Sequence, residues 1–201
     1  MSGTDVLLPM TCSRCGGDLE GEAQALICTC AACRLAFYMP DPSKSYPVRF
    51  VGALVPQEGP RVYAPFWRLT GRLALEGADP AKEAQYKRAK PLGALFFPAF
   101  WSPRLANFDN LTLRYALLDP GAIQQEEGVG EALGPGMRDP SILPEMAALT
   151  WLAYLDRRAD VTGVSAVFHP ESLLYVGVPF FRTGASLVDG LCGVRLPASL
   201  L

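Results

Sequence analysis

The chain has 201 residues and a formal net charge of −2; 50% of its residues are hydrophobic and 19% are charged. This length allows one large domain, or a small module followed by a domain of about 150 residues. The charged fraction is below the roughly 25% of ordinary soluble domains, which indicates either a buried contact with a partner or a well-filled core.

The charge is unevenly distributed along the chain. Residues 1–40 carry two basic and four acidic side chains, residues 41–103 nine and five, and residues 104–201 seven and eleven. A nucleic-acid-binding protein needs a concentrated basic face, because phosphate neutralisation supplies most of its affinity. The acidic N-terminal segment therefore argues against that role.

Two features of the sequence predict the compartment. Residues 1–10 lack a basic segment followed by a sustained apolar run, so we expect no secretory signal. The longest uncharged apolar run, residues 92–103, is too short and too interrupted by proline to span a bilayer. We expect a cytoplasmic protein, in which clustered cysteines are metal ligands rather than disulfides.

The N-terminal region holds two Cys-x-x-Cys pairs. Cys12 and Cys15 form the first pair, and Cys30 and Cys33 the second, with 14 residues between them. Two thiolates three residues apart in a tight turn can face one ion, and the glycines after Cys15 allow the chain to turn back. Residues 11–38 thus resemble a zinc ribbon, a family in which strands alternate with two such turns.

A fifth cysteine leaves the ligand set open. Cys28 and Cys30 point to the same side of an extended segment, so either can approach the ion. We favour Cys30, because it repeats the spacing of the first pair. The set Cys12, Cys15, Cys30 and Cys33 predicts one structural Zn²⁺, with iron as the less favoured alternative.

The remainder of the chain predicts a second, larger domain. A turn-rich linker over residues 41–47 separates residues 1–40, the ribbon with a short lead-in, from residues 48–201. In the larger part Pro65-Phe-Trp-Arg68 recurs as Pro179-Phe-Phe-Arg182, 114 residues later. We interpret this as an internal duplication with units at about 48–77 and 164–193. Arg68 and Arg182 either staple the units through cation–π or hydrogen-bond contacts, which we favour, or line a groove between them, with His169, for an anionic or peptide ligand.

Helices are expected between the two units. Residues 80–90 form a short charged candidate that ends before a proline, and residues 144–158 form a longer one with a broad apolar face that covers the sheet. Residues 111–118 are ambiguous between strand and helix, and residues 120–140 read as a long exposed loop. The fold class is therefore α+β and β-rich: a zinc ribbon followed by a duplicated sheet domain with one or two covering helices.

No arrangement of catalytic groups stands out. His169 is the single histidine and precedes a proline, and Cys192 lies among apolar residues. No phosphate-binding loop or nucleophile elbow is present. We therefore expect a non-catalytic zinc-ribbon adaptor that docks on a larger protein complex, or self-associates, through apolar surface. The alternatives are a nucleic-acid-associated factor, and an enzyme or carrier with a pocket between the repeats.

The chain as a whole resembles bacterial zinc-ribbon proteins that carry a β-rich C-terminal part. This resemblance covers the cysteine region most specifically and implies no activity for the larger part. It adds no catalytic or cofactor-binding residue beyond the four cysteines.

Overall fold

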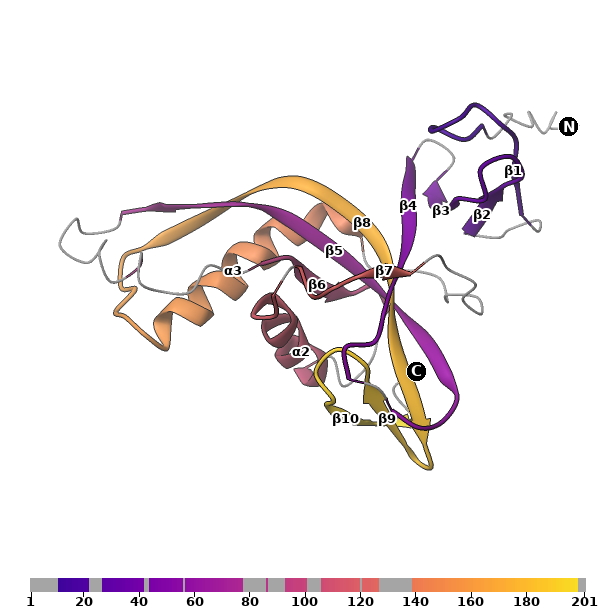
Figure 1. The fold of residues 1–201 in the computed structure, drawn as a ribbon. Helices are drawn as coiled ribbons and strands as arrows, with labels where there is room; N and C mark the ends of the chain where they lie inside the picture. The colour runs from indigo at the N-terminus through magenta and orange to yellow at the C-terminus, as the bar shows by residue number, and fades with distance from the viewer. Residues whose placement is uncertain are drawn as a thin grey trace, which may run out of the picture.

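The computed structural model describes residues 11–21, 27–41, 44–55, 57–77, 86, 93–100, 106–119, 121–126 and 139–198. Figure 1 shows two long strands, β5 and β8, running side by side, with the cysteine module of β1–β3 near one end of the sheet. Helices α2 and α3 lie below the long strands in this view.

Ten strands form one mixed sheet. Its main order is β1-β2-β3-β4-β8-β5-β6, with β7 on β4, β9 on β8 and β10 on β9. The pair of β4 and β8 is parallel, and the other pairs are antiparallel. The strands are β1 Leu19–Glu20, β2 Ile27–Cys30, β3 Ala36–Asp41, β4 Lys44–Val51, β5 Arg61–Glu76, β6 Leu95–Pro98, β7 Gln125–Glu126, β8 Ser165–Thr183, β9 Ser186–Asp189 and β10 Arg195–Pro197.

The central element is the antiparallel pair of β5 and β8. It runs from Arg61 opposite Phe181 to Glu76 opposite Ser165. In its middle, consecutive residues of both strands are buried, as expected for strands that are covered on both faces. Phe66 and Trp67 are adjacent in β5 and point to opposite faces, so they join two different hydrophobic clusters.

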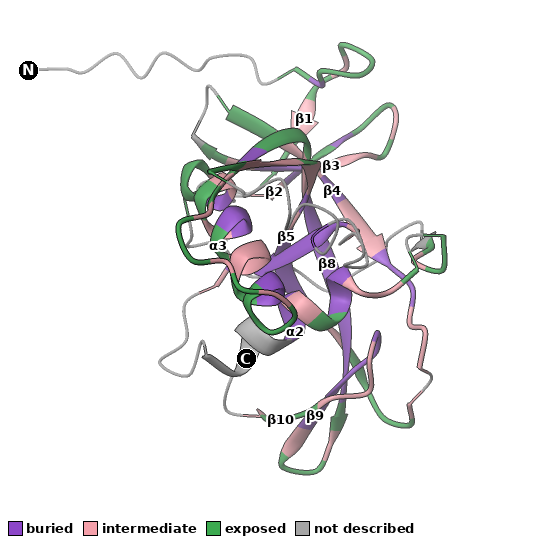
Figure 2. Ribbon diagram, turned by 90° about the vertical axis from the view of Figure 1, so that its left-hand side faces the viewer, coloured by how far each residue is buried: buried purple, intermediate pink, exposed green. Residues whose placement is uncertain are grey.

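Both clusters include helical residues. Helix α2 (Ala106–Ala116) contributes Leu111 and Tyr115 to the cluster around Phe66 and Ala116 to the cluster around Trp67. Helix α3 (Leu143–Asp156) follows a short 3-10 turn, η1 (Pro140–Ile142), and contributes Ala147 and Ala148 to the cluster around Trp67. Figure 2 shows that buried residues follow the middle of β5 and β8 and the helical surfaces near them.

The helix predictions have different outcomes. The helix expected over residues 144–158 is confirmed as α3, and it covers the sheet. The ambiguous segment at 111–118 lies mostly in α2. The helix expected at 80–90 lies outside the described residues except for Tyr86, which is buried. In the expected loop at 120–140, the structure describes strand β7 and the start of η1, and residues 127–138 lie outside its described part.

The prediction of a turn-rich linker over residues 41–47 is wrong for its second half. Strand β4 begins at Lys44 and pairs first with β3 and then with β8, so the chain continues from module to body within one sheet. Tyr46 accounts for this, since its ring lies 5.0 Å from that of Trp67, centroid to centroid. Burying an aromatic ring fixes a segment that proline and serine alone would leave as a turn. The division into two domains stays a prediction.

The two Pro-Phe-aromatic-Arg segments pair with each other. Pro65 lies opposite Gly177, and Pro179 lies opposite Tyr63. Ala64 lies opposite Val178, 114 residues further along the chain, which equals the offset between the two prolines. The two strands have different neighbours in the sheet: β6 pairs with β5, whereas β4 and β9 pair with β8. The pairing therefore leaves the internal duplication a prediction.

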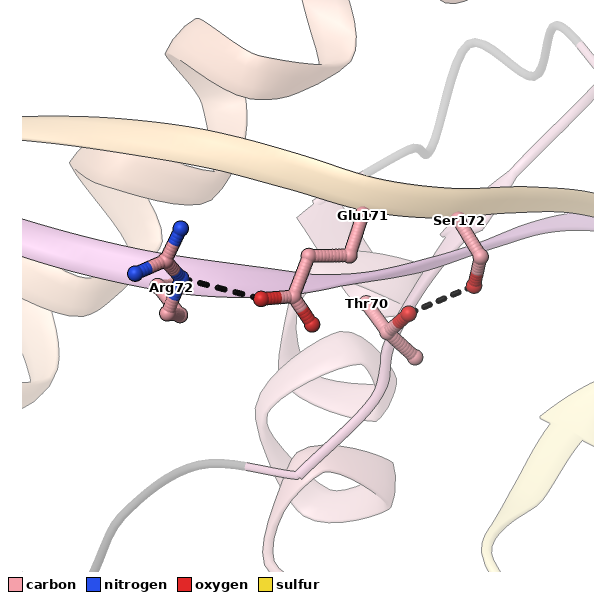
Figure 3. A network of polar contacts seen from close by, with 4 residues as sticks. All are labelled: Thr70, Arg72, Glu171 and Ser172. Atoms are coloured by element: carbon pink, nitrogen blue, oxygen red, sulfur yellow. Dashed lines mark hydrogen bonds and ion pairs between the residues drawn. The ribbon is translucent and has the colours of Figure 1, made fainter.

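A β-bulge interrupts the ladder on its exposed part. Thr70 lies opposite Ser172 and Gly71 opposite Pro170, so Glu171 is an extra residue in β8. Figure 3 shows the polar contacts around it, in which the hydroxyl groups of Thr70 and Ser172 are hydrogen-bonded and Glu171 accepts from Arg72. The ion pair is well exposed, so it contributes little to stability.

Gly71 permits the close approach of the two strands at the bulge. A Cβ atom on Gly71 would lie 2.2 Å from the carbonyl oxygen of His169 and 2.7 Å from the ring of Phe168. We expect Gly71→Ala to lower the free energy of unfolding by about 2 kcal/mol or more, because backbone must move. Urea unfolding measures this, and Gly121→Ala, where the new Cβ meets only ordinary contacts, should change stability by less than about 0.5 kcal/mol. Equal stability of the two variants would contradict the close approach.

Candidate metal centre

The first cysteine turn is held by its own backbone. The amide of Gly16 donates to the carbonyl of Cys12 at 2.8 Å, and the amide of Cys12 donates to the carbonyl of Gly17 at 2.8 Å. Gly16 has a φ of 74°, a conformation that side chains oppose, so glycine suits this position. The turn brings the side chains of Cys12 and Cys15 to the same end of the module.

The second turn repeats this backbone pattern. The amide of Arg34 donates to the carbonyl of Cys30 at 2.9 Å, and the amide of Cys30 donates to the carbonyl of Leu35 at 2.8 Å. Arg34 takes the place of Gly16 and also has a positive φ, 60°. A non-glycine residue is uncommon in that conformation, so the turn is held there at a cost in strain.

The two turns bring four thiol sulfurs together. The Sγ atoms of Cys12, Cys15, Cys30 and Cys33 all lie within 4.8 Å of one another. Sγ of Cys12 is 3.6 Å from Sγ of Cys33, and Sγ of Cys15 is 3.5 Å from Sγ of Cys30. Four sulfurs at about 2.3 Å from one Zn²⁺ would be about 3.8 Å apart in a regular tetrahedron. The cluster therefore has the size of a four-thiolate metal site.

The electrostatics of the thiols also suit a cation. The amide of Cys33 points at Sγ of Cys30 and lowers the pKa of that thiol to about 7. At Cys15 a hydrogen bond from the Gly17 amide lowers the pKa of the thiol, whereas the neighbouring sulfurs, Cys30 first among them, raise it. The net result is a pKa raised to about 12. Four crowded sulfurs cannot all ionise alone, and a divalent cation between them would allow four thiolates to coexist.

The remaining cysteines lie elsewhere. Cys28 is buried in β2 opposite Phe37, outside the group of four sulfurs, and forms no disulfide. Cys192 follows β9, and burial raises the pKa of its thiol to about 11. Among the described cysteines, Cys30 rather than Cys28 belongs to the cluster, and metal ligation by the four stays a prediction.

Stacked aromatic rings join the cysteine module to the main body. The rings of Tyr38 in β3 and Tyr175 in β8 are stacked, with centroids 4.2 Å apart and planes inclined by 10°. Trp67 of β5 meets Tyr38 and Tyr175 edge-on at 5.6 and 5.0 Å. Offset stacked and edge-to-face pairs are both favourable and add to the gain from burial. The position of the module on the sheet thus depends on three rings from three strands.

The residues considered for a pocket between the repeats do not converge. His169 is exposed on β8 opposite Arg72, and Arg182 is exposed near the other end of β8. Burial lowers the pKa of Arg68, which lies half-buried opposite Leu174. Neither Arg68 nor Arg182 makes a cation–π contact with a described residue, so that form of the expected staple is wrong for the part the structure describes. The described cation–π contacts join Arg61 to Tyr63 and Arg158 to Tyr154.

One buried polar pair escaped the sequence analysis. Asp189 is fully buried and accepts the hydroxyl of Tyr115 at 2.6 Å and the amides of Leu191 and Cys192 at 2.9 and 2.8 Å. These donors satisfy the carboxylate, and they fix the loop after β9 against helix α2. The only available signal was Asp-Gly in a turn, which is too common to single out the residue.

No protein-family model matches the chain, and no curated protein or solved structure shows significant similarity to it. Within the described residues, no helix is both long and apolar enough to cross a membrane. The functional argument therefore rests on the geometry of the described residues.

The cluster predicts opposite effects for two neighbouring cysteines. Cys30→Ser removes one of four ligands, so we expect the purified protein to lose its metal ion and the module its fold. Cys28→Ser lies two residues away in the same strand and should keep one ion per chain. Elemental analysis of both variants measures this. Equal metal content in the two proteins would contradict the assignment of Cys30.

Proposed function

We propose that the protein is a non-catalytic zinc-ribbon adaptor that binds a partner protein through an apolar face of its main body. The cysteine module holds one structural Zn²⁺ ion in this proposal. A site closed by four thiolates has no open position for a water or a substrate, so the ion stabilises the module and takes no part in a reaction. We favour zinc over iron because the role proposed for this ion is purely structural.

The observation that carries the adaptor proposal is an apolar stripe that begins at the end of η1 and continues on α3. Ile142 and Leu149 are 45% and 59% exposed, which is high for large apolar side chains. Ile142 precedes the first residue of α3 and Leu149 lies seven residues further on, so both share one side of this segment, where half-buried Met146 and exposed Ala153 continue the row. A stripe of this spacing suits the apolar face of a partner helix or a second copy of the chain.

The internal duplication is part of the proposal for the body. Its support is that the Pro-Phe-aromatic-Arg segment recurs at an offset of 114 residues and that its two copies lie on the paired strands β5 and β8. Two ancestral copies that paired antiparallel around a twofold axis would leave this relationship. Later insertions between them would then account for α2 and α3.

Substitution within the stripe tests the adaptor function. We expect the native protein to be recovered as a complex or oligomer, and Ile142→Lys with Leu149→Lys to leave it monomeric. Val167→Lys provides the control, since Val167 is also exposed, at 39%, but lies on β8 away from the stripe. Light scattering and co-purification from native cells measure both. Assembly that survives the double change, or salt-sensitive retention on nucleic acid instead, would contradict the proposal.

A further inference from the structure

A cavity of about 570 Å³ opens between α2, the end of α3 and β10. It is separate from the cysteine cluster, from the stripe on α3 and from the pairing of the two repeats. Its volume falls within the range of sites that bind small molecules, roughly 300–1,000 Å³. Three arginines and five apolar residues line it, and none of the lining residues is acidic.

The three arginines come from three different elements. Arg114 lies in the last turn of α2, Arg157 follows α3, and Arg195 begins β10. A cation near a helix C-terminus is favourable, which explains the positions of Arg114 and Arg157. It does not explain Arg195, nor why all three arginines line the same cavity.

Within the described part of the chain, these three guanidinium groups have no hydrogen bond or ion pair. Their neighbour Arg158 differs, because it donates to the carbonyl of Tyr154 and lies 3.8 Å from the centre of the Tyr154 ring. Three like charges around one cavity repel one another, and an anion between them would relieve that repulsion.

The rest of the cavity wall is apolar. It is formed by Leu111, Leu113 and Leu117 on the side of α2, and by Val194 and Leu196 on the side of β10. Leu111 and Leu196 are buried, whereas the other three are partly exposed. A ligand that contacts both the arginines and this wall must have an anionic head and an apolar body.

The wall beside β10 is held in place before any ligand binds. Asp189 accepts the amide of Cys192 at 2.8 Å and that of Val194 at 3.4 Å, and its own amide donates to the carbonyl of Val194. Tyr115 ties the same carboxylate to α2 at 2.6 Å. A rigid wall reduces the entropy that binding costs.

We propose that this cavity binds a small amphipathic anion, an alkyl chain that ends in a carboxylate or a phosphate. The guanidinium groups bind the oxygens of the head, for which their planar donor arrangement is suited, and the leucine wall buries the chain. This inference is independent of the adaptor function, because the cavity shares no residue with the stripe on α3 or with the cysteine cluster.

Calorimetry on the full, zinc-loaded chain tests the proposal with octanoate as the probe. We expect one site per chain and an affinity that rises roughly threefold with each methylene from hexanoate to decanoate. Octanol has the same chain without the charge and should bind roughly tenfold more weakly or worse. Octyl phosphate, run in parallel, shows whether the head group preferred is a phosphate or a carboxylate.

Paired arginine variants connect the binding to the cavity. Arg157→Gln with Arg195→Gln should weaken octanoate binding by roughly tenfold or more, whereas Arg182→Gln, an exposed arginine on β8, should leave it within about twofold. All three positions are exposed, and thermal unfolding confirms that the variants fold. The proposal is overturned if octanoate binds no better than octanol or acetate, or if Arg182→Gln weakens binding as much as the pair.

Discussion

The antiparallel pairing of β5 with β8 is the interaction on which the rest of the body depends. Its members lie about a hundred residues apart in sequence, so the ladder can form only after a long intervening segment has closed. The alternate side chains of these strands supply both hydrophobic clusters, as Phe66 and Trp67 illustrate. The helices pack against the faces of this ladder, and strands β4, β6 and β9 pair with its edges.

The cysteine module follows a different principle. Its two turns use contacts between residues close in sequence, and among the described residues its buried cluster consists of Cys12, Cys30 and Phe37 with a few partly buried neighbours. So small a core offsets little of the entropy of ordering the segment, which is why we propose that an ion stabilises the module. Tyr38, stacked on Tyr175, joins the module to the main sheet.

This contrast explains what the sequence predicts and what it does not. The cysteine turns and α3 could be predicted because spacing within a few residues determines them. The strand at Lys44–Pro47 could not, because Tyr46 contacts the ring of Trp67 in β5, across the intervening turn of the chain, as well as that of Tyr38 in β3. The same holds for Asp189 and for the cavity, since no local pattern connects Arg114, Arg157 and Arg195. Sites assembled by the long ladder become visible only in the folded chain.

Hydrogen exchange on the full chain, with and without a zinc chelator, tests the central claim that an ion holds the module while the ladder holds the body. The account predicts that chelation removes the protection of amides in β2 and β3, whereas the amides of β5 between Ala64 and Leu69 and those of their β8 partners between Leu173 and Val178 stay protected. Unchanged protection of β2 and β3 after the metal has been removed would contradict it.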